Sequence, residues 1–167
     1  LTFVVILTDV LKAVVAILIA VKIGGGYDPR IMPDFPLDGA TVAYYVVLFK
    51  YWAGLFCLLG HMFPCMFHFK GGKGILSGGA IAIMIDWRIA LVVWGGFLIL
   101  AILTRYVSLG SCWAGASFPF ATWFVYHNVV ITVLGAVIGL LILYMHRGNI
   151  KRLLTGTENK FSLHKKK

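Results

Sequence analysis

The chain has 167 residues, of which 60% are hydrophobic, and it carries a formal net charge of +9. Soluble domains contain about 45–50% apolar residues, so this surplus excludes an ordinary water-soluble fold and predicts one integral membrane domain over residues 1–167. The charge does not indicate a nucleic-acid partner, because the basic residues gather at the ends of apolar segments and in the C-terminal tail, where they suit anionic lipids and anionic substrates.

Apolar segments alternate with short polar breaks along the whole chain. The first segment begins inside an apolar run without a methionine, which we interpret as truncation of upstream residues. A membrane span needs about 20 residues, so the third segment, with only 12, is marginal. The sequence predicts an all-α, polytopic membrane helix bundle with six spans and a basic tail after them at 146–167. The spans are residues 1–23, 42–63, 74–85, 89–103, 107–125 and 129–145.

The basic residues predict which way the bundle faces. Strict alternation of the six spans places the loop 64–73, the turn near residue 105 and the tail on one face, where Glu158 is the single acid. The loop 24–41 on the other face holds three of the chain's six acids against one arginine. By the positive-inside rule the first face is cytoplasmic. Its basic residues are Lys70, Lys73, Arg105, Arg147, Lys151, Arg152, Lys160, Lys165, Lys166 and Lys167.

The sequence FKGGKG at residues 69–74 places three glycines and two lysines just before the third segment. Glycines let backbone N–H groups approach a ligand closely, and a helix N-terminus attracts anions. The loop therefore predicts a phosphate site, although a solvated hairpin facing lipid headgroups is the alternative. The groups expected to contact phosphate are Lys70, Lys73 and the amides of Gly71, Gly72 and Gly74.

The tail begins with HRGNIKRLLTGTE at residues 146–158. His146, Asn149 and Arg152 recur at three-residue spacing, so they can share one face of a short helix. Asparagine can donate to phosphate oxygens and arginine can hold them with two parallel hydrogen bonds. A polybasic lipid anchor is the alternative, and it suits residues 165–167 better. An electrostatic anchor alone does not require the histidine, the asparagine or Glu158.

Charged side chains also occur inside the spans. Asp9 and Lys12 lie three residues apart in the first span, where buried charges usually face the interior of a bundle. They fit a structural pair and a pair that organises a site equally well. His61 stands one turn before the glycine loop, and Arg105 and Ser108 follow the fourth span. All these groups converge on one face of the membrane, which indicates a binding site there.

The chain resembles the bacterial acyl-phosphate-dependent glycerol-3-phosphate acyltransferases. GHMFPCMFHFKGGKG is similar to the second signature of that family, and DVLK, TRYVSL and HRGNIKRLLTGTE are similar to other stretches in order and spacing. The family's first helix and its first signature, a Ser-Gly-Asn loop, would precede residue 1. Smaller departures are ILS at residues 75–77, where the family favours Val-Ala-Thr, and Gly148, where a larger polar residue is usual.

The resemblance implies a seven-helix enzyme of the bacterial inner membrane, of which six spans lie in this chain. It implies transfer of an acyl group from acyl phosphate to the 1-hydroxyl of sn-glycerol 3-phosphate, with acyl phosphate made by a partner enzyme. It implies no metal and no cofactor. We assign catalytic roles to Lys73, His146 and Asn149, and substrate binding to His61, Lys70, Gly71, Gly72, Lys73, Gly74, Arg105, Ser108, Arg152 and Glu158.

Two other classes of function use similar residues. Basic groups at the mouth of a helix bundle also suit an anion channel or carrier, although such a path predicts polar residues through the full membrane depth. A non-catalytic membrane scaffold with a polybasic tail is the third class, and its function would not depend on Lys73.

Overall fold

The computed structural model describes residues 2–24 and 38–161, so most of the predicted loop 24–41 and the lysines at 165–167 lie outside the described residues. Over the described residues the chain is helical and contains no strand, which confirms the all-α prediction. Each of the six predicted apolar segments is a helix. The elements are α1 (Thr2–Gly24), α2 (Gly39–Met62), a 3₁₀ turn (Cys65–Phe67), α3 (Ile75–Ile85), α4 (Trp87–Thr104), α5 (Val107–Tyr126), α6 (Val129–Met145) and α7 (Arg147–Leu154).

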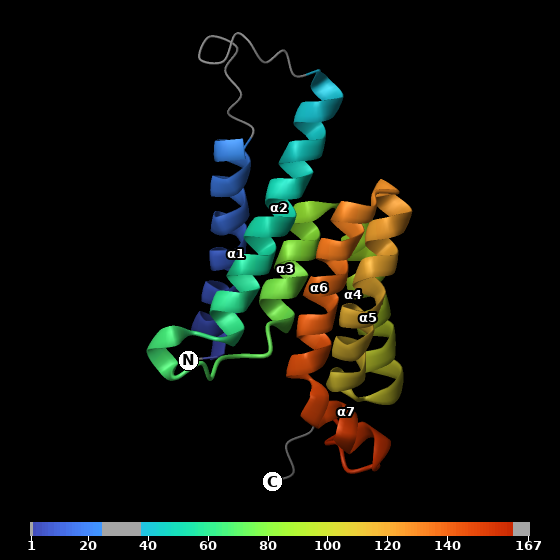
Figure 1. Ribbon diagram of the computed structural model, residues 1–167. Coiled ribbons are helices and arrows are strands. Elements are labelled where there is room, and N and C mark those ends of the chain that lie inside the picture. The colour runs from blue at the N-terminus through green and yellow to red at the C-terminus, as the bar shows by residue number, and fades with distance from the viewer. Residues whose placement is uncertain (1, 25–37, 162–167) are drawn as a thin grey trace.

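The helices form a bundle with α3 near its centre (Figure 1). Helix α3 packs against α1, α2, α4 and α6, while α5 lies between α4 and α6. Small residues allow the closest approach, because a side chain at Gly115 or Gly139 would meet the backbone of the other helix. Close packing of small residues helps to hold helices together in a membrane, because apolar side chains gain little free energy by moving from lipid into a helix interface.

Length and composition identify three helices that can cross a membrane alone: Phe3–Ile23, Gly39–Phe67 and Trp87–Thr104. Helices α6 and α7 meet at a bend of 61° and give a fourth span if they are taken together. The structure thus confirms a polytopic membrane bundle, whereas the count of six spans stays a prediction.

Helix α3 has only 11 residues, about 16 Å at 1.5 Å per residue, which is half the thickness of the hydrocarbon core. Its last carbonyl, that of Ile85, accepts hydrogen bonds from Lys50 Nζ at 3.3 Å and from the Tyr126 hydroxyl at 3.5 Å. The predicted break over residues 86–88 is shorter than expected. Only Asp86 lies between the helices, and its side chain caps α4 by accepting from the Arg88 amide.

The sequence motifs meet at one end of the bundle. The start of α1, the loop before α3, the turn between α4 and α5, and helix α7 all lie toward the bottom of the view in Figure 1. The antiparallel course of the helices causes this, because α2, α4 and α6 end where α3, α5 and α7 begin.

Candidate functional site

The glycine pair of the predicted phosphate loop folds back onto the end of α2. The Gly71 amide donates to the Met62 carbonyl at 3.1 Å, and the Gly72 amide donates to the His61 carbonyl at 3.2 Å. A Cβ at Gly71 would collide with the His61 carbonyl, and one at Gly72 would collide with the His61 ring. Gly71 and Gly72 thus allow close packing, and their N–H groups already have backbone acceptors in α2. Their role in phosphate binding stays a prediction.

The start of α3, unlike the glycine pair, has backbone amides that are not engaged by α2. Gly74 caps the helix with φ of +72°, a left-handed conformation that favours glycine. The first intrahelical bond is donated by Gly78 to the Gly74 carbonyl, so the amides of residues 75–77 precede the hydrogen-bonded helix. These N–H groups and the helix dipole attract anions, and Lys73 stands directly before them. The α3 N-terminus is thus where the structure leaves amides without intrahelical acceptors.

Four of the predicted side chains form one hydrogen-bonded chain, which we call the Asn149 network. Lys73 Nζ donates to Asn149 Oδ1 at 2.8 Å, and Asn149 Nδ2 donates to Glu158 Oε1 at 2.8 Å. Arg152 Nε donates to the other Glu158 oxygen at 2.7 Å. Asn149 is buried, whereas the Arg152 side chain is 47% exposed. The network therefore joins the glycine loop, α7 and the tail around a buried amide.

The tail reaches the network by turning back after α7. Gly156 has φ of +69°, and Thr157 N donates to the Arg152 carbonyl at 2.8 Å. This turn brings Glu158 under α7, where hydrogen bonds, first from Asn149 and then from Arg152, lower the pKa of its carboxyl group despite burial. The carboxylate thus stays ionised and orients an amide and a guanidinium.

Arg105 lies at the same end of the bundle but joins it through its backbone. Its carbonyl accepts from the Phe161 amide at 2.7 Å, so the returning tail is fastened to the turn between α4 and α5. The side chain is exposed, as is that of Lys70 in the glycine loop. These two cations therefore contribute positive potential at the predicted face, and neither is part of the Asn149 network.

Ser108 and His146 are buried beside the network. The Ser108 hydroxyl has no partner in hydrogen-bond geometry among the described residues, yet it lies close enough to Glu158 to help lower the pKa of that carboxyl. His146 joins α6 to α7, and its Nδ1 lies 2.8 Å from the Ile142 carbonyl. Because a carbonyl only accepts, Nδ1 carries a proton, and in the neutral form of the ring Nε2 is an acceptor.

A second polar group lies between α1, α2 and α3, and we call it the Asp9 cluster. Lys12 Nζ lies 2.6 Å from Asp9 Oδ1 and 2.5 Å from His61 Nδ1. Ser77, in the first turn of α3, donates to the Asp9 carbonyl at 3.2 Å. The sequence indicated the Asp9–Lys12 pair but not its link to His61, 49 residues away from Lys12. It also missed Ser77, whose only signal was its place in the turn after the glycine loop.

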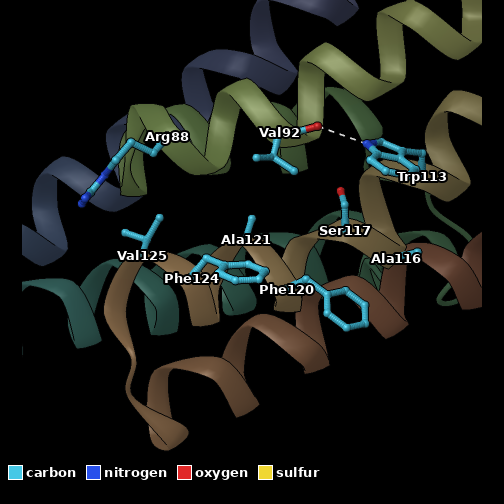
Figure 2. Close-up of a pocket in the computed structure, with 9 residues that line it drawn as sticks. All are labelled: Arg88, Val92, Trp113, Ala116, Ser117, Phe120, Ala121, Phe124 and Val125. Atoms are coloured by element: carbon cyan, nitrogen blue, oxygen red, sulfur yellow. Dashed lines mark hydrogen bonds between the residues drawn. The ribbon is translucent and has the colours of Figure 1, made fainter.

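An apolar groove lies away from these residues. It has a volume of about 550 Å³ and runs between α4 and α5, with Arg88 near one end. Figure 2 shows Phe120 and Phe124 beside it and the Trp113 indole N–H directed at the Val92 carbonyl, at 3.1 Å. The lining is apolar apart from Arg88 and Ser117 and contains no member of the Asn149 network. The groove suits hydrocarbon chains rather than the chemistry of a phosphate.

The fold and the polar end define a polytopic α-helical membrane protein with a basic site at one end of its bundle. A model of the family described as "Glycerol-3-phosphate acyltransferase" matches residues 1–156. The chain therefore belongs to the glycerol-3-phosphate acyltransferase family.

Curated relatives with that name agree. The protein of Chlorobaculum tepidum is 32% identical, over 98% of this chain and 76% of the relative. The Aquifex aeolicus protein is 35% identical, over 92% and 70% respectively. The Fusobacterium nucleatum protein is 38% identical, but the match covers 65% of this chain and only 56% of that relative.

Solved structures show the same fold. The crystal structure of PlsY (YgiH), an integral membrane glycerol 3-phosphate acyltransferase, in its glycerol 3-phosphate form has a TM-score of 0.61 and 26% identity. The alignment covers 90% of this chain and 96% of that one. The lysophosphatidic acid form of the same protein gives 0.61 and 27%, with 90% and 95% covered.

Proposed function

We propose that the protein transfers a fatty acyl group from acyl phosphate to the 1-hydroxyl of sn-glycerol 3-phosphate, giving lysophosphatidic acid and phosphate. Family membership and the glycerol 3-phosphate and lysophosphatidic acid forms of the solved relative support this proposal. The observation that carries it is the Asn149 network, in which Lys73 of the glycine loop donates to Asn149 of the tail motif, and Asn149 and Arg152 both donate to the Glu158 carboxylate.

The chemistry of this acyl transfer explains why a site built from cations and backbone amides can catalyse it. The hydroxyl oxygen attacks the acyl carbonyl carbon, and the bond from that carbon to the phosphate oxygen breaks. Phosphate leaves with the electron pair and is a weak base, with a second pKa of about 6, so no strong general acid is needed. The main task is to hold two mutually repelling phosphates together and to orient the hydroxyl.

The proposed roles follow from the contacts. Lys73 and the first amides of α3 bind phosphate, and Arg152 binds it through the guanidinium nitrogens not used by Glu158. Asn149 holds Lys73 in place, while Lys70 and Arg105 add positive potential. Two acceptors are available for the proton of the hydroxyl: the departing phosphate and Nε2 of His146.

We also propose that the protein lies in the bacterial inner membrane with this site facing the cytoplasm. The basic residues at the polar end support that orientation through the positive-inside rule. An enzyme that makes acyl phosphate on the cytoplasmic side would supply the donor. The acyl tail would remain among the apolar helices while the phosphate stays at the polar end.

The donor is tested with a full-length form of the protein in lipid nanodiscs. Glycerol 3-phosphate is mixed with acyl phosphate, acyl coenzyme A or acylated carrier protein of the same chain length, and lysophosphatidic acid is measured by mass spectrometry. We expect product from acyl phosphate alone. Equal rates with a thioester donor would contradict the donor assignment. Glycerol 3-phosphate flux into proteoliposomes that hold the same protein, without product, would favour the carrier.

A further inference from the structure

We propose that Asp9 and Lys12 position His61 as a neutral hydrogen-bond donor, with its proton on Nε2, against the glycine pair that precedes Lys73. The inference rests on the proposed function and adds Asp9 and Lys12 to it as positioning residues. It assigns a use to a pair of membrane-embedded charges that phosphate binding alone does not require.

The contact with Lys12 fixes the position of the proton on the His61 ring. Lys12 Nζ lies 2.5 Å from Nδ1, and an ammonium group has only donors, so Nδ1 must accept. Asp9 Oδ1 lies 2.6 Å from the same Lys12 nitrogen and forms an ion pair with it. A second proton on the ring would put two positive N–H groups against each other. His61 is therefore neutral and carries its proton on Nε2.

The Nε2 edge of the His61 ring faces the backbone of Gly72. A Cβ placed on Gly72 would collide with His61 Nε2, so this edge lies directly against the Gly72 backbone. The Gly72 amide also donates to the His61 carbonyl at 3.2 Å. His61 thus holds Gly72 with both its ring and its backbone, and Lys73 is the next residue. The ring position sets where the Lys73 side chain leaves the loop.

The histidines His61 and His146, at the same end of the bundle, use their ring nitrogens in opposite ways. His146 donates from Nδ1 to the Ile142 carbonyl and keeps Nε2 as an acceptor. His61 accepts at Nδ1 and keeps Nε2 as a donor. A glutamine side chain can place its amide nitrogen near the position of a histidine Nε2, whereas the shorter asparagine reaches only the region of Nδ1. A comparison of His61→Gln with His61→Asn therefore tests whether the protein needs a hydrogen-bond donor at the Nε2 position or only a polar side chain at residue 61.

The charges around His61 predict a pH response that appears only when Lys12 is removed. Lys12 and Asp9 act on it from α1, Cys57 lies one turn earlier on α2, and Lys70 and Lys73 flank the glycine pair. Without Lys12 the neutral ring would donate from Nδ1 to Asp9, 3.5 Å away, and lose the proton on Nε2. Protonation restores that donor, so activity of the variant falls as pH rises through the histidine pKa.

The experiment measures kcat and KM for both substrates from pH 5.5 to 8.5 in nanodiscs. We expect His61→Asn and Lys12→Met to lose about 10- to 100-fold in kcat/KM, because the first removes the ring edge against Gly72 and the second removes the hydrogen bond to Nδ1. His61→Gln should stay within several-fold of wild type, and Lys12→Met should show a new fall in activity above pH 6.5. Lys22→Met, the same change at the exposed far end of α1, should leave activity unchanged.

Nitrogen NMR of histidine-labelled wild-type protein tests the tautomer without any turnover. A proton on His61 Nε2 supports the inference, and a proton on Nδ1 overturns it. Equal activity of folded His61→Gln and His61→Asn also overturns it. If wild type makes no product from acyl phosphate, the proposed function fails, and the NMR result still decides the tautomer.

Discussion

The Asp9 cluster and the Asn149 network lie at the same end of the bundle but differ in charge. In the Asp9 cluster one lysine faces one carboxylate and a neutral ring, so the charges cancel. In the Asn149 network Arg152 pairs with the carboxylate of Glu158 while Lys73 donates to the neutral amide of Asn149, which leaves one net positive charge. A balanced cluster between helices holds positions, because an unpaired charge there is costly. An unbalanced cluster at the membrane surface attracts an anion.

The largest expected effect is that of Lys73→Ala. Removal of one preorganised group that stabilises developing charge costs about 10²- to 10³-fold in kcat. We expect that loss in acyl transfer, with normal membrane insertion and an unchanged melting temperature. Lys151→Ala, which removes one exposed positive charge from α7, is the matched control and should keep activity. Full turnover by Lys73→Ala would reject the Asn149 network as the site.

Asn149→Leu should have the second largest effect. It removes both hydrogen bonds of a buried amide and leaves Lys73 Nζ and one Glu158 oxygen without those partners. Leaving a buried polar partner unsatisfied costs about 1–3 kcal/mol, so we expect kcat/KM to fall about 10- to 100-fold. Steady-state kinetics in nanodiscs give the number. A loss confined to thermal stability would show that the network has a structural role only.

Gly72→Ala tests whether the glycine pair is packed as described. The added Cβ would meet the His61 ring, and overpacking of this kind costs about 1–3 kcal/mol. We expect a lower melting temperature by a few degrees and reduced activity. Gly60→Ala is the control, because a Cβ there meets nothing within 4 Å. A neutral result at both glycines would show that the loop does not rest on His61.

The smallest effect concerns the attachment of the tail at acid pH. Because the folded pKa of Glu158 is lowered, its contribution is complete above the ordinary value of about 4.3 and is lost as pH falls through the folded pKa. We expect the Phe161 amide, bonded to Arg105, to exchange hydrogen faster in that acidic range. Glu158→Gln should show faster exchange already at neutral pH. Unchanged exchange in the variant would separate the tail from the network.

The sequence predicted helix α7 better than the turn after it or the contacts of the glycine pair, and the reason is physical. The start of α7 and the spacing of Asn149 and Arg152 were predictable, because three-residue spacing on a helix is a local property. The fold-back that brings Glu158 to both side chains depends on the left-handed turn at Gly156, and the sequence signal for it is a single glycine. The amides of Gly71 and Gly72 were assigned to phosphate because their acceptors at the end of α2 could not be foreseen.

The sequence by itself determined the class of the protein and the order of its helices. Long apolar runs and short polar breaks act locally, through the cost of exposing backbone and charge to lipid, so they can be read without knowing the fold. Only the tertiary structure decided which cation meets which carboxylate, which groups face the ring nitrogens of His61 and His146, and which amides already have acceptors. Those pairings depend on how helices far apart in the chain pack against one another, and composition and spacing do not encode that packing.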